Sequence, residues 1–208
     1  MTSSSRCSGR AEPGRSLPKL FVISGPSGAG KGTLISGLLA HSDRYVVAIS
    51  ATTRPRRSGE VDGREYHFLG DDEFQRRVDG GEYLEHVGYA GGRYGTLAGE
   101  VDRLQATGKG VILELEIEGA FAVRRRRPDA TLVFVCPPSF DDLERRLRAR
   151  ATDSAGEIEV RLAIAHEQLR ERDNFDIAII NDDAERATRE LQQRLDALLD
   201  ADSVKGSE

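Results

Sequence analysis

Residues 25–33 read GPSGAGKGT and directly follow the apolar run LFVI at residues 20–23. A short buried strand, a glycine-rich turn and a helix in this order are typical of a phosphate-binding loop. Backbone N–H groups of such a turn surround an anion, the helix N-terminus adds its dipole, and Lys31 reaches the β- and γ-phosphates. We therefore expect a nucleoside triphosphate to be bound by Gly25, Pro26, Ser27, Gly28, Ala29, Gly30, Lys31, Gly32 and Thr33.

The loop departs from the general pattern G-x-x-x-x-G-K-[ST] at its last position. Gly25, Gly30 and Lys31 match the pattern, but Gly32 stands where a serine or threonine is usual, and Thr33 follows. In the general pattern that hydroxyl contacts Mg²⁺. We therefore expect no direct protein ligand for Mg²⁺, which would be held by phosphates and waters, with Thr33 on the α-phosphate.

The composition indicates one domain with short appendages. The chain has 208 residues and a net charge of −5, so bulk attraction to nucleic acid or to anionic membrane is not expected. No apolar run approaches the ~18 residues that a membrane span needs. The two cysteines, Cys7 and Cys136, make no disulfide framework and indicate a reducing compartment, so we expect a cytoplasmic location. The four histidines lack the spacing of a metal site.

Residues 1–18 are rich in Ser, Gly, Arg and Pro and contain one acidic residue, Glu12. Such a segment buries too little apolar surface to fold, so we predict a disordered N-terminal tail. An organellar transit peptide has a similar composition. The amphipathic helix that such a peptide needs is disfavoured here by Gly9, Pro13, Gly14 and Pro18.

Strand and helix patterns alternate from residue 20 onward. Strands are predicted at 20–24, 45–48, 111–115, 131–136 and 177–180, and helices at 33–40, 97–107, 120–127, 141–150, 158–172 and 183–199. This alternation predicts an α/β fold, in which a central parallel sheet is covered by helices on both faces and the ligand lies at the carboxyl ends of the strands. Residues 50–96 are more charged and punctuated by glycines, which predicts a small mixed lobe. Within it we expect a helix at 71–78, capped by Asp71 or Asp72.

Several further motifs are spread over residues 20–199. The full set is GPSGAGKGT at 25–33, SATTRPRRSGE at 50–60, GREYHF at 63–68, EYLE at 82–85, RYGT at 93–96, PPSFDDLERRLRAR at 137–150 and NDD at 181–183. Any one of these motifs alone is weak. Together, in this order, they closely resemble the guanylate kinase family.

The resemblance implies a P-loop kinase that transfers a phosphoryl group from ATP to GMP, and also to dGMP, in purine nucleotide metabolism and GMP recycling. It divides residues 19–199 into a nucleotide core (19–49, 97–145 and 164–199), a GMP-binding lobe (50–96) and a helical lid (146–163), followed by a C-terminal tail at 200–208. The implied partners are ATP and GMP or dGMP, with no nucleic acid and no membrane. Monomer and homodimer both stay open.

Guanine presents two adjacent donors, N1–H and the N2 amino group, beside one acceptor, O6. The resemblance implies that the Glu85 carboxylate meets the donors, while Ser50 and Thr96 lie near O6. Glu116 matches a position that also meets the amino group. Arginine forks and phenolic hydroxyls suit the phosphate dianion of GMP. The resemblance assigns that phosphate to Arg54, Arg57, Tyr66 and Tyr94, and it adds Glu60 and Glu114 to the GMP-binding set.

No general base is required, because the second pKa of the attacking GMP phosphate, near ~6, leaves it largely ionised at neutral pH. Catalysis then rests on alignment and on cancellation of charge. The resemblance assigns this work to Mg²⁺, with Glu114 reaching it through water, and to Lys31, Arg57, Arg146, Arg150 and Arg161. It places Asn181 in the ATP site. A solvated helix face is the preferred interpretation of Arg145, Arg148, Arg170 and Arg172.

Two features complicate this interpretation. Glu114 and Glu116 stand where many relatives have aspartates, and the extra methylene alters the reach of each carboxylate. The four arginines at 124–127 suggest nucleic acid binding. We interpret them as a solvated helix end, because cations are favoured at helix C-termini and the protein is acidic.

Two other classes of protein remain as alternatives. A guanylate-kinase-like binding module would use the same lobe to hold phosphorylated peptides without catalysis, and the intact loop with Lys31 argues against it. Another P-loop enzyme, such as an adenylate kinase or a GTPase, is the second alternative. Glu85 with Thr96 argues against adenine as the acceptor base, and the chain has no N-K-x-D motif of the GTPase type.

Overall fold

The structure is a computed structural model, and it describes residues 19–89, 91–149 and 155–205. The expected N-terminal tail at 1–18 and Arg150 of the expected lid lie outside these residues. No helix within the described ranges is long and apolar enough to cross a membrane.

A five-stranded parallel sheet forms the centre of the fold, with β1 as its middle strand. In spatial order its strands are β2 (Tyr45–Val47), β7 (Gly110–Glu114), β1 (Leu20–Ser24), β8 (Thr131–Cys136) and β9 (Ile177–Ile180). Because the strands are parallel, their carboxyl ends meet at one edge of the sheet. The segments that follow β1, β7 and β9 therefore come together there, as the sequence predicts.

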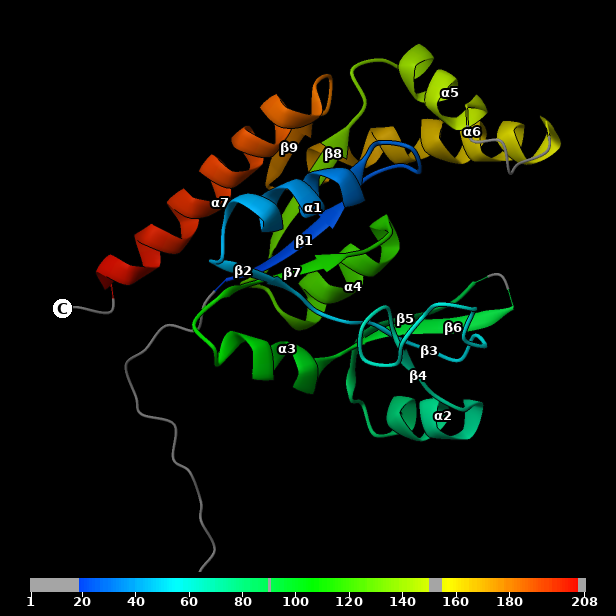
Figure 1. Ribbon diagram of the computed structural model, residues 1–208, viewed down its shortest axis with the longest axis vertical. Helices are drawn as coiled ribbons and strands as arrows, with labels where there is room; N and C mark the ends of the chain where they lie inside the picture. The colour runs from blue at the N-terminus through cyan, green and yellow to red at the C-terminus, as the bar shows by residue number, and fades with distance from the viewer. Residues whose placement is uncertain (1–18, 90, 150–154, 206–208) are drawn as a thin grey trace, which may run out of the picture.

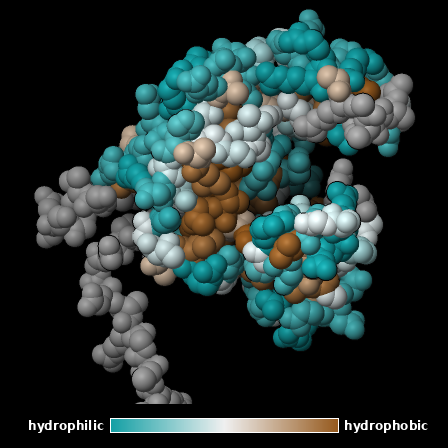
Figure 2. Space-filling model, in the orientation of Figure 1, coloured by the Kyte–Doolittle hydropathy of each residue, from teal (hydrophilic) through white to brown (hydrophobic). Residues whose placement is uncertain are grey.

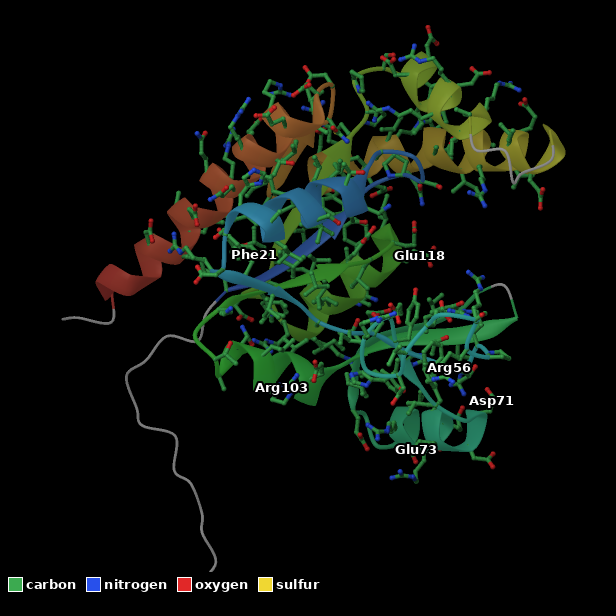
Figure 3. The ribbon with its side chains drawn as sticks, viewed as in Figure 1. Phe21, Arg56, Asp71, Glu73, Arg103 and Glu118 are labelled. Carbon is green, nitrogen blue, oxygen red and sulfur yellow. The ribbon has the colours of Figure 1, made fainter. Side chains whose placement is uncertain are left out.

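Helices cover both faces of this sheet (Figure 1). They are α1 (Lys31–His41) and α7 (Ala184–Lys205) on one face, and α3 (Ala98–Gln105) and α4 (Ile117–Arg126) on the other. Side chains alternate along β1, so that Phe21 (Figure 3) and Ile23 join the apolar cluster under α1 and α7. Leu20 and Val22 join the cluster under α3 and α4. A strand buried on both faces has a continuous apolar sequence, and the predicted α/β fold is confirmed.

A second sheet is built from the segment that was expected to form the GMP-binding lobe. Its order is β4 (His67–Phe68), β3 (Ala51–Thr52), β6 (Gly92–Leu97) and β5 (Tyr83–Tyr89), with α2 (Asp71–Asp79) beside it. The core of this lobe is small: the rings of Phe74 and Tyr83 stack with centroids 4.6 Å apart next to Ala51. The lobe therefore has an apolar core of its own, separate from the two clusters of the main sheet.

Helices α5 (Phe140–Arg148) and α6 (Ala155–Arg170) form an arm on the other side of the sheet edge, and a 3-10 turn, Glu171–Asn174, follows α6. The two helices share a small core of Leu143, Leu147, Ile158 and Leu162. Figure 2 shows the surface hollowed between this arm and the second sheet. Of the expected lid at 146–163, residues 146–148 lie on α5 and residues 155–163 on α6, and residues 150–154 lie outside the described part of the chain.

Several helix ends differ from those expected: α4 begins at Ile117 rather than at residue 120, and α6 begins at Ala155 rather than at residue 158. Helix α1 begins at Lys31 rather than at residue 33, so the loop enters the helix directly after Gly30. Helix α2 is preceded by the extended Gly70 without a side-chain cap, and the expected cap by Asp71 or Asp72 is wrong because both lie in the first turn. Helix α7 continues to Lys205 instead of ending at 199, and Asp200 in the added part pairs with Arg44 at 2.5 Å.

The arginines at 124–127 are only in part a solvated helix end: Arg125 and Arg126 are exposed, but several of the side chains have partners in other segments. Arg124 pairs with Asp176, and the guanidinium of Arg126 donates to backbone carbonyls of the second sheet. Arg127 lies 3.1 Å from Asp102 and is 19% exposed. These contacts connect α4 to three neighbouring segments, and a local sequence pattern does not predict such distant partners.

Candidate functional site

The glycine-rich turn lies between β1 and α1 and needs glycine at two positions. Gly25 has φ +141°, and a Cβ there would lie 2.4 Å from the carbonyl oxygen of Val135. Gly30 has φ +93°, and a Cβ there would lie 2.3 Å from the Asn181 amide nitrogen. Gly30 is also the N-cap of α1 and offers no side-chain acceptor. The first N–H groups of α1 are therefore left for an anion, which is the geometry expected of a phosphate site.

Lys31 lies over this loop. Its Nζ donates to the carbonyl of Gly25 at 2.6 Å and points to that of Pro26 at 3.4 Å. The side chain is 9% exposed, so its charge is concentrated at the loop rather than in bulk solvent. This is the position from which a lysine acts as a point charge on phosphate oxygens.

Asn181 links the loop to the helical arm. Its Nδ2 donates to the carbonyl of Ala29 at 2.7 Å, and its own carbonyl accepts from Arg146 Nη2 at 2.8 Å. Arg146 Nη1 also lies 3.4 Å from the carbonyl of Ala29. The side-chain amide of Asn181 thus holds the phosphate-binding turn, and its backbone carbonyl holds the arginine of α5. The NDD motif pointed to Asn181, but this structural role could not be read from it.

The second sheet holds a buried carboxylate, Glu85, which is 7% exposed. Thr96 Oγ1 donates to its Oε1 at 2.8 Å, and the pairing of β5 with β6 sets these residues side by side. Burial raises the pKa of the Glu85 carboxyl, and hydrogen bonds from Thr96 oppose that rise. Because the single proton of Thr96 goes to Glu85, the hydroxyl expected near guanine O6 is already used. Ser50, the other hydroxyl expected near O6, is half-buried.

An ordered cluster surrounds Arg54 on the same lobe. Its Nη2 lies 2.8 Å from Glu60 Oε1, while Glu60 Oε2 accepts the backbone N–H of Arg57 at 2.7 Å. These two donors hold the pKa of the Glu60 carboxyl below its usual range. The Arg54 guanidinium lies 5.6 Å from the Tyr66 ring, and Tyr66 meets Tyr94 edge-on at 5.8 Å. The structure therefore brings together Arg54, Tyr66 and Tyr94, and Glu60 also fixes the backbone of Arg57.

Two carboxylates lie at the carboxyl end of β7, the strand next to β1. Glu114 is exposed as a residue, yet neighbouring protein atoms keep enough water from its carboxyl to raise the pKa of that group. The charge of Lys31 lowers this pKa, and Glu116 raises it. Glu116 is exposed, and Gln168 of α6 lies 3.5 Å from its Oε2. In the described part of the chain, no group of three His, Cys, Asp or Glu side chains could hold a metal by itself. A cation here would need oxygens from a ligand as well.

The remaining residues expected in the site have fewer contacts with the groups described above. Thr33 and the side chain of Arg57 are exposed, and Arg161 lies half-buried on α6. Gly119 of α4 was not expected in the site, yet a Cβ there would lie 3.5 Å from Glu85 Oε2. Sequence spacing carries no signal for this contact, because it depends on how α4 packs on β5. The arrangement as a whole offers an anion site on the main sheet and a carboxylate pocket with an arginine cluster on the second sheet.

Comparison with known proteins gives a consistent result. A sequence profile of the family described as guanylate kinase matches residues 17–198. A guanylate kinase of Rubrobacter xylanophilus is 48% identical over 173 residues, which cover 83% of this chain and 91% of the relative. One of Symbiobacterium thermophilum is 46% identical over 180 residues, covering 86% and 85%. The crystal structure of a guanylate kinase from Anaplasma phagocytophilum superposes with a TM-score of 0.69 at 27% identity, covering 89% of this chain and 88% of that one.

Proposed function

Because the chain belongs to the guanylate kinase family, we propose that its two sites hold the two substrates of that reaction, ATP on the glycine-rich loop and GMP on the second sheet. The enzyme transfers a phosphoryl group from ATP to GMP and releases ADP and GDP. What remains to be assigned is the work of each residue. The observation that carries the assignment is the buried Glu85 carboxylate beside Thr96.

We propose that Glu85 recognises the guanine base. One of its oxygens accepts from Thr96, and the carboxylate has lone pairs left for the N1–H and N2 donors of the base. Thr96 fixes the orientation of that carboxylate, and Ser50 donates to O6. Glu116, at the N-terminal end of α4, accepts from the second proton of the amino group. Adenine lacks N1–H and carries an amino group in place of O6, so it would leave Glu85 buried and unpaired.

We propose that the cluster around Arg54 binds the phosphate of GMP, the acceptor substrate. Arg54 and Arg57 supply guanidinium forks, and Tyr66 and Tyr94 supply phenolic donors. Glu60 keeps Arg54 and the backbone of Arg57 in place, which favours binding because less side-chain freedom is lost when the phosphate arrives. The phosphate oxygen then attacks without a general base, since it is already ionised at neutral pH.

The donor side aligns and neutralises the triphosphate. Lys31 and the N-terminus of α1 contact phosphate oxygens, and Thr33 contacts the α-phosphate. Arg146, which Asn181 holds beside the loop, and Arg161 of α6 add positive charge as negative charge shifts during transfer. Arg150, outside the described residues, is proposed for the same task on the grounds of its motif.

Mg²⁺ fits the donor set at this edge of the sheet. The nearby protein groups are carboxylate oxygens, which together with phosphate oxygens are the ligands that Mg²⁺ takes up in kinases. We propose Glu114 as the protein group that holds it, through water or directly. When bound, the ion would neutralise charge on the transferred group. Use of dGMP and a cytoplasmic location complete the proposal.

The function is tested by a coupled assay of ADP release with GMP, dGMP, AMP, CMP and UMP as acceptors. We expect kcat/KM for GMP to exceed that for AMP by ~10³ or more, because a buried carboxylate discriminates strongly against a base that cannot pair with it. Activity with dGMP should be measurable. Equal use of AMP and GMP would contradict the assignment of the guanine pocket.

A further inference from the structure

We propose that Gly119 of α4 is a specificity-determining residue for the 2-amino group of guanine, because the absence of a side chain there leaves room for that group beside Glu85. The inference rests on the proposed function in one respect, namely that Glu85 binds the N1–H and N2 donors of GMP. It goes further in making α4, a helix that covers the main sheet, one wall of the base pocket. Glu118, labelled in Figure 3, marks this end of α4.

The contact between Gly119 and Glu85 carries the inference. A Cβ built at Gly119 would lie 3.5 Å from Glu85 Oε2 and 3.5 Å from Leu115 Cβ, which are ordinary van der Waals distances. Gly119 lies within α4 and is not among the glycines with positive φ, so the backbone does not require glycine here. Glycine is also less favourable than alanine inside a helix. Packing within the chain therefore does not explain this glycine, whereas a ligand that uses the space does.

The orientation of Glu85 decides which donor of guanine meets each oxygen. Thr96 donates to Oε1, and the pairing of β3 with β6 brings Ser50 beside Thr96. The two hydroxyls expected near O6 therefore lie at the Oε1 end of the carboxylate. Along the edge of guanine the order is O6, N1–H and then the N2 amino group. The amino group consequently comes to Oε2, which is the oxygen that Gly119 borders.

Contacts between α4 and β5 hold Gly119 in this place. Leu84, the residue before Glu85, packs in the apolar cluster that also contains residues of α4. Near the other end of the helix, the Arg126 guanidinium donates to the backbone carbonyl of Tyr83. The helix is thus attached to the strand immediately before the carboxylate, and this attachment opposes a shift of α4 away from Glu85.

A methyl group at position 119 would compete with the amino group for the space at Oε2. The N2 nitrogen must come to about 2.9 Å from this oxygen to donate a hydrogen bond. A carbon 3.5 Å from the same oxygen obstructs part of that approach. Hypoxanthine keeps O6 and N1–H but has a hydrogen in place of the amino group. Its nucleotide, IMP, therefore tests the space at Gly119 while the rest of the base edge stays the same.

The test compares kcat/KM for GMP and for IMP in the coupled assay of ADP release. For Gly119→Ala we expect a loss of about tenfold with GMP, as the loss of one hydrogen bond predicts, and a change of less than about threefold with IMP. The ratio of kcat/KM for GMP to that for IMP should therefore fall. The KM for ATP should stay nearly constant, because the glycine-rich loop belongs to the main sheet.

The matched control is Gly99→Ala, which adds the same methyl group to the first turn of α3, where the new Cβ would enter open space. This variant should leave the GMP-to-IMP ratio unchanged. Thermal melts check folding, and Gly119→Ala should be at least as stable as the wild type, since alanine favours a helix. An unchanged ratio in Gly119→Ala would overturn the proposal, and so would equal losses with GMP and IMP. Equal use of AMP and GMP by the wild type would instead contradict the proposed function, so the two failures are distinguishable.

Discussion

At the scale of single residues, binding and stability make opposite demands on Glu85. Burial makes the carboxylate a strong and selective partner for guanine. The same burial disfavours the charged form of the carboxyl group. Thr96 offsets only part of that cost with a 2.8 Å hydrogen bond. A side chain kept charged in such a place is expected at a site that recognises a ligand rather than in a core selected for stability.

The cost at Glu85 predicts a stability that depends on pH. Burial raises the folded-state pKa, so the stability linked to this carboxyl is full below the unfolded-state pKa and is lost as pH rises through the folded-state pKa. Glu85→Gln should therefore raise the Tm of the enzyme without ligands at pH 7, by about 2–4 °C for an effect of about 1 kcal/mol. The difference should shrink towards pH 4. Differential scanning calorimetry checks this, with Glu118→Gln as the exposed control; a lower Tm at pH 7 would contradict it.

Lys31 is a second residue whose surroundings define its role. Lys31→Met keeps the length of the stem but removes the charge over the loop, so turnover should fall by ~10³ or more. The circular dichroism spectrum should stay native, because the lost hydrogen bonds are confined to the loop carbonyls. Lys109→Met, far from the loop in the sequence, serves as the control. Near-normal turnover in Lys31→Met would rule out the charge role.

At the scale of elements, the site depends on contacts between segments that are far apart in the chain. Asn181 follows β9, yet it holds a turn about 150 residues earlier and an arginine of α5. The carbonyl of Ala29 is shared by both partners, so the loop and α5 are positioned together. The donor site is therefore shaped by one buried residue at the edge of the sheet, through its side-chain amide and its backbone carbonyl.

Loss of that amide should weaken ATP binding. Asn181→Ala leaves the carbonyl of Ala29 without its 2.7 Å donor, and the KM for ATP should rise about tenfold, since a lost buried hydrogen bond costs about 1–1.5 kcal/mol. The KM for GMP should change less than threefold because the acceptor site is separate. Asn174→Ala, on the exposed turn after α6, is the matched control. Equal changes in both KM values would point to a general loss of structure instead.

Elements and residues differed in how far sequence predicted them. The central strands were placed to within a residue or two because each is a short apolar run, and the glycine-rich loop is a local motif. The added part of α7 pairs with Arg44, and Arg124 of α4 pairs with Asp176, both of them distant in the chain. Such pairings are set by packing. The same holds for Thr96, whose proton goes to Glu85 only because β5 and β6 are paired in that register.

At the scale of the molecule, the two sites lie on different bodies. The loop, Lys31 and Asn181 belong to the main sheet, whereas Glu85 and the Arg54 cluster belong to the second sheet. Figure 2 shows the surface hollowed between the second sheet and the arm of α5 and α6. In-line transfer requires the donor and acceptor phosphates to meet, and two anionic nucleotides neutralise the arginines that line the approach.

Ligand binding should therefore bring the bodies closer. Small-angle scattering should show a smaller radius of gyration with a bisubstrate analogue that joins adenosine and guanosine through phosphates than in the enzyme alone. ATP alone should give only part of the change, because it does not bridge the second sheet. Identical scattering profiles in all three states would indicate a rigid molecule and contradict this expectation.

The most direct test of guanine recognition by Glu85 is to measure kcat/KM of Glu85→Gln with GMP and with AMP. The amide accepts at one atom and turns a donor toward guanine, so kcat/KM for GMP should fall by ~10²-fold or more while the KM for ATP stays nearly constant. The preference for GMP over AMP should collapse by a similar factor. If Glu85→Gln phosphorylates GMP normally and still rejects AMP, guanine is recognised elsewhere and the pocket assigned to Glu85 is wrong.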